Sequence, residues 1–541
     1  MSLDTVISSF STRKPDEALR SVKAFFQFPV LPEYLTSEVL LSSCYRALGY
    51  SSLRDAWISS NGKMLWKLVS EEEGFCPSPF NRNEVRRLLR DVLLSPEDPK
   101  QKRGQKYPDF LFLAPIVPAT ALFSNPIRLS RNANSSGNNP WNVESLFKAL
   151  VAYSSRNEAD GGDMWNRLFG ALAVQNSDED DFFARIVDRM FRECANHLKE
   201  TGLIDAQRLP LWSKSENDLY SPDQFFIAPS DREVFSEASP LDEIRDGLRL
   251  ILELKQDFSR WQWITIFDAH LRMSMMAFVM WLLELHHIVS VAIQKYILDG
   301  MPIPNVSDRV FYRHLASESR EGSKDDMFYY GEGFSKAQGR VVARYARDAM
   351  RIAFFLDVAK DLNPAKFLSV KWDTFGGFVS SLKAFLPDFQ TSTIKSGFQA
   401  GFVKLIDESK DFLNPSKGRL KHFLQFFAVL RQKAITDGQR DFIRYDQSFL
   451  VRKKGGYSRA PFIVDFGGVT CFVAAYCCAK GRRVFPKTEL LNYLEKFYVK
   501  IRSTHDAQFV EHLKGLGLTM DSPDAGGGLM ILNPFFGEKI R

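Results

Sequence analysis

The stretch WQWITIFDAHLRMSMMAFVMWLLELHHIVSVAIQKYIL, residues 261–298, is the most membrane-like part of the sequence. Its longest clean apolar run, residues 273–283, is shorter than the roughly 20 residues that a transmembrane helix needs. Ionisable residues interrupt the stretch elsewhere, namely Asp268, His270, Arg272, Glu284, His286 and His287. We therefore expect a long helix buried in the core of a soluble protein, and no membrane partner.

The composition around this stretch is that of an ordinary folded protein. The chain has 541 residues, of which 45% are hydrophobic and 25% charged, and this length exceeds what one hydrophobic core usually serves. Phe occurs 46 times, against 32 Gly and 25 Pro, which favours helices. The N-terminus has no apolar segment typical of a signal peptide, and the six cysteines show no disulfide spacing. We expect a mainly helical, multidomain, cytoplasmic protein.

The domain boundaries follow composition. The sequence SNPIRLSRNANSSGNNP at 124–140 is rich in residues that favour turns and is the best linker candidate. The predicted division is a helical N-terminal domain (1–123), this linker (124–140), a helical central domain with the long apolar helix (141–330), a basic helical domain (331–465) and a C-terminal domain (466–541).

Periodicity predicts several individual elements. Helices are expected over 37–48 and 84–94, and the apolar run 110–117 fits either a buried strand or a helix edge. A second polar stretch follows at 154–163. Helix breaks in the basic domain are expected at three prolines, in Asn363-Pro364, Leu386-Pro387 and Asn414-Pro415.

The C-terminal domain differs in kind from the rest. Apolar spacing predicts helices over 469–480 and 487–499, and a third helix from Ser503 or Thr504 to Gly515 or Gly517. The sequence LTMDSPDAGGGLMILNPF (518–535) then reads as two short strands around a turn.

Three helices followed by a hairpin resemble the winged helix-turn-helix fold over about 467–535. The resemblance implies a third helix that enters the DNA major groove and a hairpin that touches the backbone. The exposed positions of that helix would be His505, Gln508 and His512, with Lys500 and Arg502 at its start.

The sequence also departs from this pattern. Asp506 and Glu511 lie on or near the same face, and the hairpin carries Asp521 and Asp524 but no Lys or Arg. Phosphates repel such a surface. Winged helices also dock proteins, so both kinds of partner stay open.

A row of cations marks the start of the basic domain. Its members are spaced by four, four, three and four residues and share one helical face; they are Lys336, Arg340, Arg344, Arg347 and Arg351. Like charges at this spacing destabilise a helix, and nucleic-acid phosphates would neutralise them. The alternatives are a solvated helix face, or a row that pairs with acidic residues inside the fold, such as Asp325, Asp326 or Glu332.

A second basic concentration lies between residues 404 and 459. It holds thirteen Lys or Arg against six acidic residues, an excess of seven that is larger than the net charge of +6 for the whole chain. The sequence Arg452-Lys453-Lys454-Gly455-Gly456-Tyr457, with Arg459, reads as a flexible basic loop. Together with the row it predicts a positively charged surface in the C-terminal half.

Signs of catalysis are weak. The histidines and carboxylates of 261–298 lack the HExxH spacing of a zinc site, so no metal and no cofactor are expected. Pro387-Asp388 with Glu408-Ser409-Lys410 is superficially similar to the PD-(D/E)xK nuclease pattern. That pattern requires adjacent strands around Mg²⁺, whereas 402–413 has helical spacing.

These observations favour a non-enzymatic subunit that binds nucleic acid, with duplex DNA as the expected partner, in a multi-protein DNA-processing or phage-defence complex. The alternative is a scaffold that docks protein subunits without touching DNA. A divergent Mg²⁺-dependent nuclease is the third hypothesis.

Overall fold

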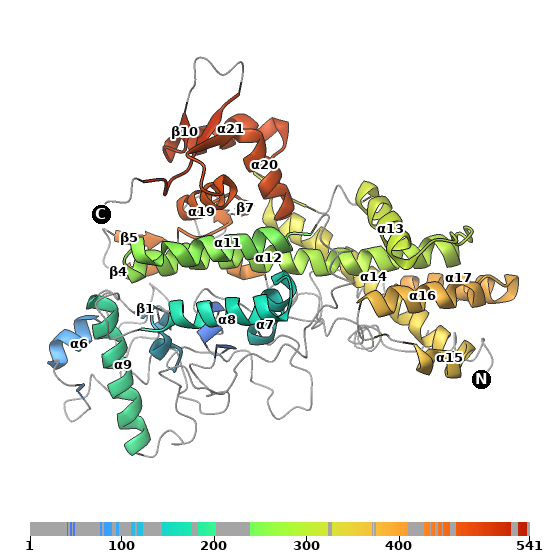
Figure 1. Cartoon of the computed structure of the whole chain (residues 1–541), viewed down its shortest axis with the longest axis horizontal. Coiled ribbons are helices and arrows are strands. Elements are labelled where there is room, and N and C mark those ends of the chain that lie inside the picture. Colours follow the sequence, from blue (N-terminus) through green and yellow to red (C-terminus); the bar gives the residue numbers. More distant parts are fainter. Residues whose placement is uncertain are drawn as a thin grey trace.

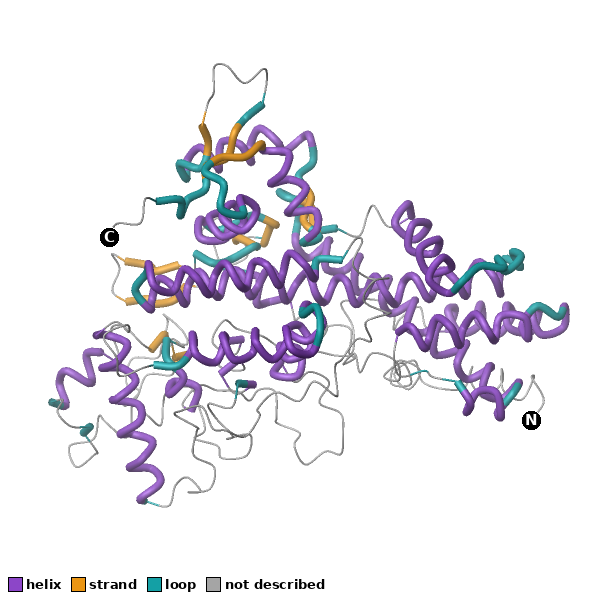
Figure 2. Tube along the Cα trace, in the orientation of Figure 1, coloured by secondary structure: helices purple, strands orange, loops and turns teal. Residues whose placement is uncertain are grey.

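The structure is a computed structural model, and it is mostly helical with small sheets (Figures 1 and 2). It describes residues 40–41, 44–45, 47–48, 76–77, 81–88, 94–96, 110–113, 116–122, 143–174, 182–201, 239–322, 327–370, 372, 375–408, 427–432, 434–438, 442–445, 447–454, 461–520 and 528–537. The mainly helical prediction is confirmed. The predicted linker, 124–140, lies outside the described residues.

Helix α12 (Arg260–Ile293) is the axis of the molecule and continues as a π-helical turn, Gln294–Leu298. Ser259 and Gln262 start it with a capping box. Its most apolar 18-residue window is long enough to cross a membrane but is 89% buried inside the protein. The helices that pack against it are α7 (Val143–Ser154), α11 (Leu241–Glu253), α13 (Asp308–Gly322), α14 (Phe334–Leu362) and α19 (Gly468–Ala479). An apolar surface on every side of a helix requires such neighbours on every side.

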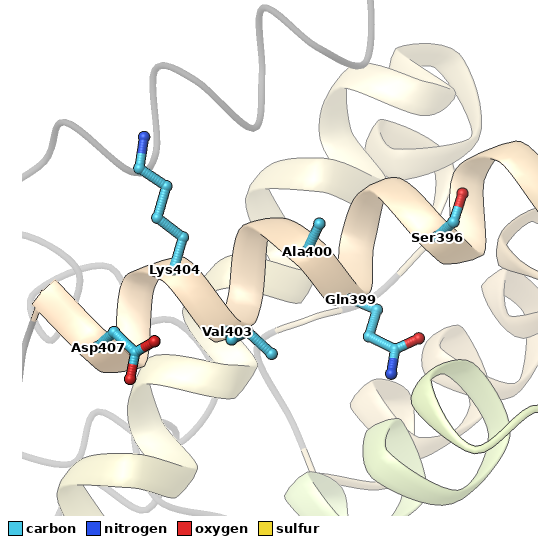
Figure 3. A pocket seen from close by; sticks show the side chains of 6 residues that line it. All are labelled: Ser396, Gln399, Ala400, Val403, Lys404 and Asp407. Carbon is cyan, nitrogen blue, oxygen red and sulfur yellow. The ribbon is translucent and has the colours of Figure 1, made fainter.

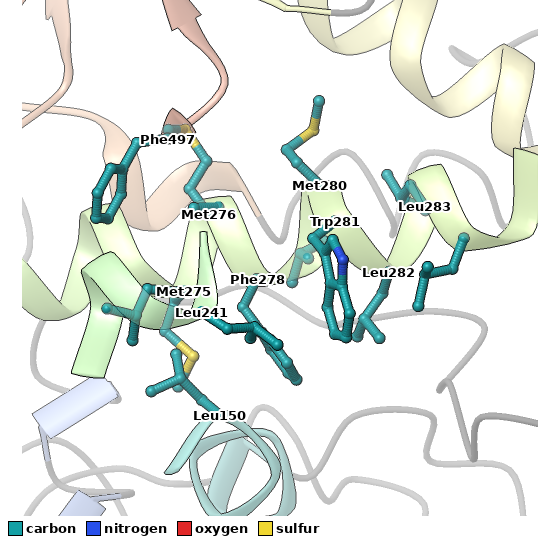
Figure 4. Close-up of a cluster of buried hydrophobic side chains, with 14 of the residues drawn as sticks. Leu150, Leu241, Met275, Met276, Phe278, Met280, Trp281, Leu282, Leu283 and Phe497 are labelled. Atoms are coloured by element: carbon teal, nitrogen blue, oxygen red, sulfur yellow. The ribbon is translucent and has the colours of Figure 1, made fainter. Parts of the chain in front are cut away.

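One side of α12 is covered by α7 (Val143–Ser154), α8 (Glu158–Leu172) and α11 (Leu241–Glu253). Figure 4 shows Leu150 of α7 and Leu241 of α11 beside Met275 and Phe278 of α12. Asn157 caps α8 through its side chain, so the polar stretch at 154–163 is a tight turn followed by the start of a helix.

The N-terminal elements are short. Residues 40, 41, 44, 45 and 47 are helical, as predicted, followed by α6 (Arg82–Leu88), β1 (Leu94–Pro96), β2 (Phe110–Leu113), η2 (Pro118–Leu122) and, after α8, α9 (Phe182–Glu200). The sequence predicted either a strand or a helix edge for 110–117, and residues 110–113 form a strand, because β2 pairs antiparallel with β1. The predicted helix 84–94 is wrong at its end, because Leu94 belongs to this sheet.

At the other end of α12 lie α13 (Asp308–Gly322), α14 (Phe334–Leu362), α15 (Pro364–Ser369), α16 (Phe375–Phe389) and α17 (Ser392–Glu408). Asn363 ends α14 and caps α15, as its Asn-Pro sequence predicts. The predicted break at Pro387 is wrong. Pro387 lies in the last turn of α16, where the burial of Leu386 and Phe389 outweighs one lost hydrogen bond. Asn414-Pro415 lies outside the described residues.

The C-terminal elements are short strands and helices. A 3-10 turn, Phe427–Leu430, precedes the hairpins β4–β5 (Ala434–Gly438, Phe442–Tyr445) and β6–β7 (Val451–Lys453, Phe462–Val464). After them come α19 (Gly468–Ala479), β8 (Val484–Pro486), α20 (Lys487–Lys496), β9 (Val499–Lys500), α21 (Ser503–Gly515), β10 (Thr519–Met520) and β11 (Met530–Leu532).

Residues 467–537, here called the C-terminal unit, lie above α12 in Figure 1. Strands β10, β11 and β8 form one antiparallel sheet in that order. The predicted turn at 481–486 thus contains a strand, and the predicted helix 487–499 ends at Lys496. Strand β9 pairs in parallel with β3 (Phe328–Tyr329), which precedes α14. One connected cluster of buried residues runs from Leu40 to Ile531, and the division into domains stays a prediction.

Substituting Gly247 of α11 by alanine is expected to destabilise the protein by about 3 kcal/mol. A Cβ there would overlap Cε1 of His270 and lie 2.8 Å from its Nε2, and this ring is completely buried. Gly170 of α8 is the matched control, because a Cβ there meets nothing within 4 Å. Gly170→Ala should stabilise the helix slightly. Thermal melting of both variants checks this, and equal melting temperatures would contradict it.

Two buried histidines make the stability depend on pH. Burial lowers the pKa of His270 and of His286 to about 4, so both are neutral in the folded protein. The unfolded chain takes up their protons near pH 6.5; the stability they contribute is complete above that pH and is lost as the pH falls toward 4.

We expect the two histidines together to lower the free energy of unfolding by about 3 kcal/mol between pH 7.5 and 5.5. Urea denaturation at both pH values measures this loss. The variant His286→Gln should lose about half as much, and a loss equal to that of the wild type would contradict the assignment.

Candidate nucleic-acid interface

The predicted row of cations lies on one helix, α14, as its spacing requires. Lys336 and Arg347 are exposed, whereas Arg340, Arg344 and Arg351 are partly buried. The helix buries its opposite side, including Val341, Val342 and Tyr345, in the core. The row therefore lies along the boundary between the exposed and the buried side of a core helix.

Arg340 is held by groups of its own fold. Its Nη1 lies 2.8 Å from Oε1 of Glu332, and its Nη2 donates to the carbonyl oxygen of Met327 at 2.8 Å. The guanidinium also lies 5.8 Å from the centre of the Tyr329 ring. The pairing with Glu332, one alternative given by the sequence, is what the structure contains; Asp325 and Asp326 lie outside the described residues.

Arg344 and Arg351 belong to a buried polar network between α12 and α14. Burial lowers the pKa of Arg344, opposed by the charges of Asp348 and Glu284. Tyr498, just before β9, donates its hydroxyl hydrogen bond to Oε2 of Glu284. Arg351 donates to Oγ of Ser290 at 2.8 Å, and burial lowers its pKa too.

Asp348 lies at the centre of this network. Burial alone would raise its pKa, but the hydrogen bond and charge of His287 and the charge of Arg344 outweigh burial and hold the pKa below its usual value. His287 Nδ1 lies 2.9 Å from Oδ2 of Asp348. Asp348 is therefore a buried carboxylate that carries its charge, as its cationic neighbours require.

The interpretation of five open cations is thus corrected for three of them. Arg340, Arg344 and Arg351 have carboxylate or hydroxyl partners inside the fold, because a half-buried guanidinium needs compensation. Lys336 and Arg347 are the members of the row that present exposed charge.

The β6 segment brings further cations to the start of α14. Arg452 stands opposite Ile463 in the β6–β7 pair, and Ile463 bridges to Gly333, which precedes α14. Arg452 pairs with the buried Asp465 at 2.7 Å. Lys454 is exposed and Lys453 partly buried. Arg459 and the Gly455-Gly456-Tyr457 loop lie outside the described residues.

The start of α21 lies beside Tyr329, close to the start of α14. The guanidinium of Arg502 stacks on the Tyr329 ring, 3.7 Å from its centre, so Arg340 and Arg502 contact one ring although 162 positions separate them in the sequence. Lys500 pairs with Glu495 at 3.1 Å. Gln508 is exposed, and His505 and His512 are partly buried.

Two acidic residues of α21 pair with lysines. Lys487 lies 2.7 Å from Oδ2 of Asp506, and Lys514 lies 3.5 Å from Oε1 of Glu511. The repulsion of phosphate expected from Asp506 is therefore reduced by its neighbour. Asp521 and Asp524 of the hairpin turn lie outside the described residues.

Sequence reasoning missed Arg431. Its guanidinium lies 5.5 Å from the centre of the Phe334 ring and 5.0 Å from that of Phe462, so it joins α14 to β7. The spacing of charges carries no signal for such a contact. The aromatic residues of MFYYGEGF (327–334), which hold Arg340, Arg431 and Arg502, are the only local hint.

The described residues contain no group of three or more His, Cys, Asp or Glu placed to hold a metal ion. On α12, Asp268 pairs with Arg272 at 2.6 Å and His286 Nδ1 lies 2.7 Å from the carbonyl oxygen of Leu282. A hollow over α17, shown in Figure 3, is lined by residues of this helix alone: Ser396, Gln399, Ala400, Val403, Lys404 and Asp407. One helix face does not enclose a small molecule.

The nuclease pattern does not assemble on strands. Asp388 lies in α16 and pairs with Lys366 at 2.7 Å, and Glu408 ends α17; Ser409 and Lys410 lie outside the described residues. Because the pattern needs its carboxylates on adjacent strands, Asp388 and Glu408, which lie on helices, do not form it.

Cationic segments from three distant parts of the sequence thus meet around Tyr329 and Gly333: the start of α14, the end of β6 and the start of α21. These three segments form the candidate site. In comparisons with known proteins, no family model, no curated protein and no solved structure matches this chain.

Proposed function

We propose that this chain binds duplex DNA as a non-enzymatic subunit of a larger DNA-processing assembly. The proposed contact is a surface made of Lys336, Arg347, Lys453, Lys454 and Arg502, here called the basic surface. The observation that carries the proposal is the convergence of these segments around the Tyr329 ring and the N-terminus of α14.

Physical considerations support phosphate as the ligand. Glu332, Glu284 and Asp348 are already engaged by the half-buried arginines of α14, and Lys336 and Arg347 lie exposed at the surface. Lys336 and Arg347 are eleven residues apart on α14, which corresponds to about 16 Å. That length matches about five base-pair steps of a duplex, and each phosphate contact releases a condensed counterion.

The order of elements in the C-terminal unit supports the winged-helix part of the proposal. Helices α19, α20 and α21 are followed by the β10–β11 pair, and β8, between the first two helices, is the third strand of the sheet. We propose that this unit is a winged helix. A winged helix alone does not imply DNA binding, because one fold serves several functions; the exposed cations are what support binding.

The second candidate function is a scaffold that docks other protein subunits. One observation favours it: the outward face of α21 carries no excess charge, because Lys514 and Glu511 pair on it. A balanced helix face suits a protein partner better than a phosphate backbone.

Titration of a fluorescent 24-base-pair duplex with the full chain, followed by anisotropy, separates the two functions. If about five phosphates are contacted, raising the salt concentration from 50 to 200 mM should weaken binding by about 500-fold. Absent binding at 50 mM, or binding that does not respond to salt, would contradict the proposal and favour the scaffold.

A further inference from the structure

One side of the first turn of α21 is covered by another part of the chain, while Ser503 and Thr504 stay exposed. Strand β3 adds to β9: the amide of Phe328 donates to the carbonyl of Tyr498 at 2.9 Å, and that of Tyr330 to the carbonyl of Lys500 at 3.0 Å. Arg502 stacks on Tyr329. The residues that precede α21 are therefore fixed to the segment that leads into α14.

His505 is enclosed in the same way. Gly331 has φ +79, and a Cβ at that position would lie 2.5 Å from Cδ2 and 2.6 Å from Nε2 of the His505 ring. Glycine is required there for both reasons. The imidazole thus lies directly over the backbone of residue 331.

The covering segment is part of the core. Tyr330 is 2% exposed, and its ring lies 5.2 Å from that of Phe509 of α21 and 5.6 Å from that of Phe466. Separating α21 from residues 328–331 would expose these aromatic rings to water, which is unfavourable. The cover is a permanent feature of the fold.

A helix that reads bases inserts its N-terminal residues into the major groove. In α21 those residues, Arg502 and His505, are held against Tyr329 and Gly331. The face that stays exposed carries Ser503, Thr504, Gln508, Glu511 and Lys514, and the side chain of Glu511 is 73% exposed. Because Lys514 and Glu511 pair on this face, it offers no excess of positive charge that would draw it between two phosphate backbones.

We infer that α21 does not enter the major groove, and that the chain binds duplex DNA through phosphates without reading its base sequence. This inference rests on the proposed function. It assigns the affinity to the basic surface and none of it to base contacts from Gln508, His505 or His512.

Selection from a pool of duplexes with 20 randomised base pairs tests the inference with the full chain. Bound duplexes are recovered over several rounds and sequenced. We expect the pool to bind with no enriched sequence, and Gln508→Ala to change the affinity for the pool by less than 2-fold, whereas Lys336→Glu weakens it at least 10-fold.

Two outcomes would overturn the inference. The first is an enriched sequence that binds more than 10-fold tighter than its shuffled version; loss of that preference in Gln508→Ala would identify α21 as the reader. The second is a pool that does not bind at 50 mM salt, which also overturns the proposed function. Sequence preference and absence of binding are thus distinguishable failures.

Discussion

Replacing Arg260 by methionine is expected to lower the free energy of unfolding by about 4 kcal/mol. Arg260 is the first residue of α12 and is 4% exposed. Its Nε donates to the carbonyl oxygen of Ile116 at 3.0 Å, its Nη1 to that of Ala173 at 2.8 Å, and its Nη2 to that of Leu172.

Two of these carbonyls belong to the C-terminal end of α8, where no further turn supplies amide donors. Methionine fills the same space but leaves the acceptors buried without their charged donor. A lysine carries the charge but not the planar fork, so Arg260→Lys should recover only part of the loss.

The matched control is Arg167→Met. Arg167 lies in α8 and pairs with Glu253 at 3.7 Å. Both side chains are solvent-exposed, by 37% and 62%. Such a pair contributes less than about 1 kcal/mol. Thermal melting of the three variants measures the contrast; similar melting temperatures for Arg260→Met and Arg167→Met would show that the Arg260 contacts do not hold α8 to α12.

Reversing three charges of the basic surface is expected to weaken duplex binding by about 1,000-fold at 0.1 M salt. The variant is Lys336→Glu, Arg347→Glu and Lys454→Glu. Each lost phosphate contact removes about 1 kcal/mol of counterion release, and the new carboxylates repel the backbone. All three residues are exposed, so the fold should be retained, and the melting temperature checks this.

A charge-matched control separates local contact from overall charge. Arg313 of α13, Lys360 near the end of α14 and Lys404 of α17 are equally exposed, and they lie on the helices at the other end of the molecule (Figure 1). Reversal of these three should weaken binding by less than 10-fold. Equal losses in the two triple variants would mean that net charge, and not the basic surface, determines affinity.

The parts of the fold that a local pattern specifies could be predicted from the sequence. The apolar stretch 261–298 has too many charged residues for a transmembrane helix and too few for a helix on the protein surface. The sequence therefore predicts a helix buried in the core. The helices of the C-terminal unit follow from apolar spacing. Strand β8 could not be found this way, because three residues are too few to show a periodicity, and its pairing with β11 is set by residues 44 to 48 positions away.

Proline shows how packing overrides a local rule. Asn363-Pro364 ends a helix because Asn363 caps the next one, and this could be predicted. Leu386-Pro387 has the same form but lies inside α16, since the buried side chains on either side stabilise the final turn. The sequence alone does not state which side chains are buried.

For the candidate site, the sequence predicted which cations share a helical face, but not which groups of the fold pair with them. Steps of three and four residues place five cations on one face of α14, and among their partners Glu332 and Asp348 are close in sequence. Glu284 lies on another helix and Tyr498 in the C-terminal unit. Likewise, nothing local predicts that Arg502 and Arg340 share the ring of Tyr329.

The slope of log K against log salt concentration, measured for the wild type and for Lys336→Gln/Arg347→Gln, tests the central claim most directly, because it counts phosphate contacts. If both residues contact phosphates of duplex DNA, neutralising them lowers the magnitude of the slope by about 1.8. A variant slope equal to that of the wild type would show that α14 does not contact the phosphate backbone.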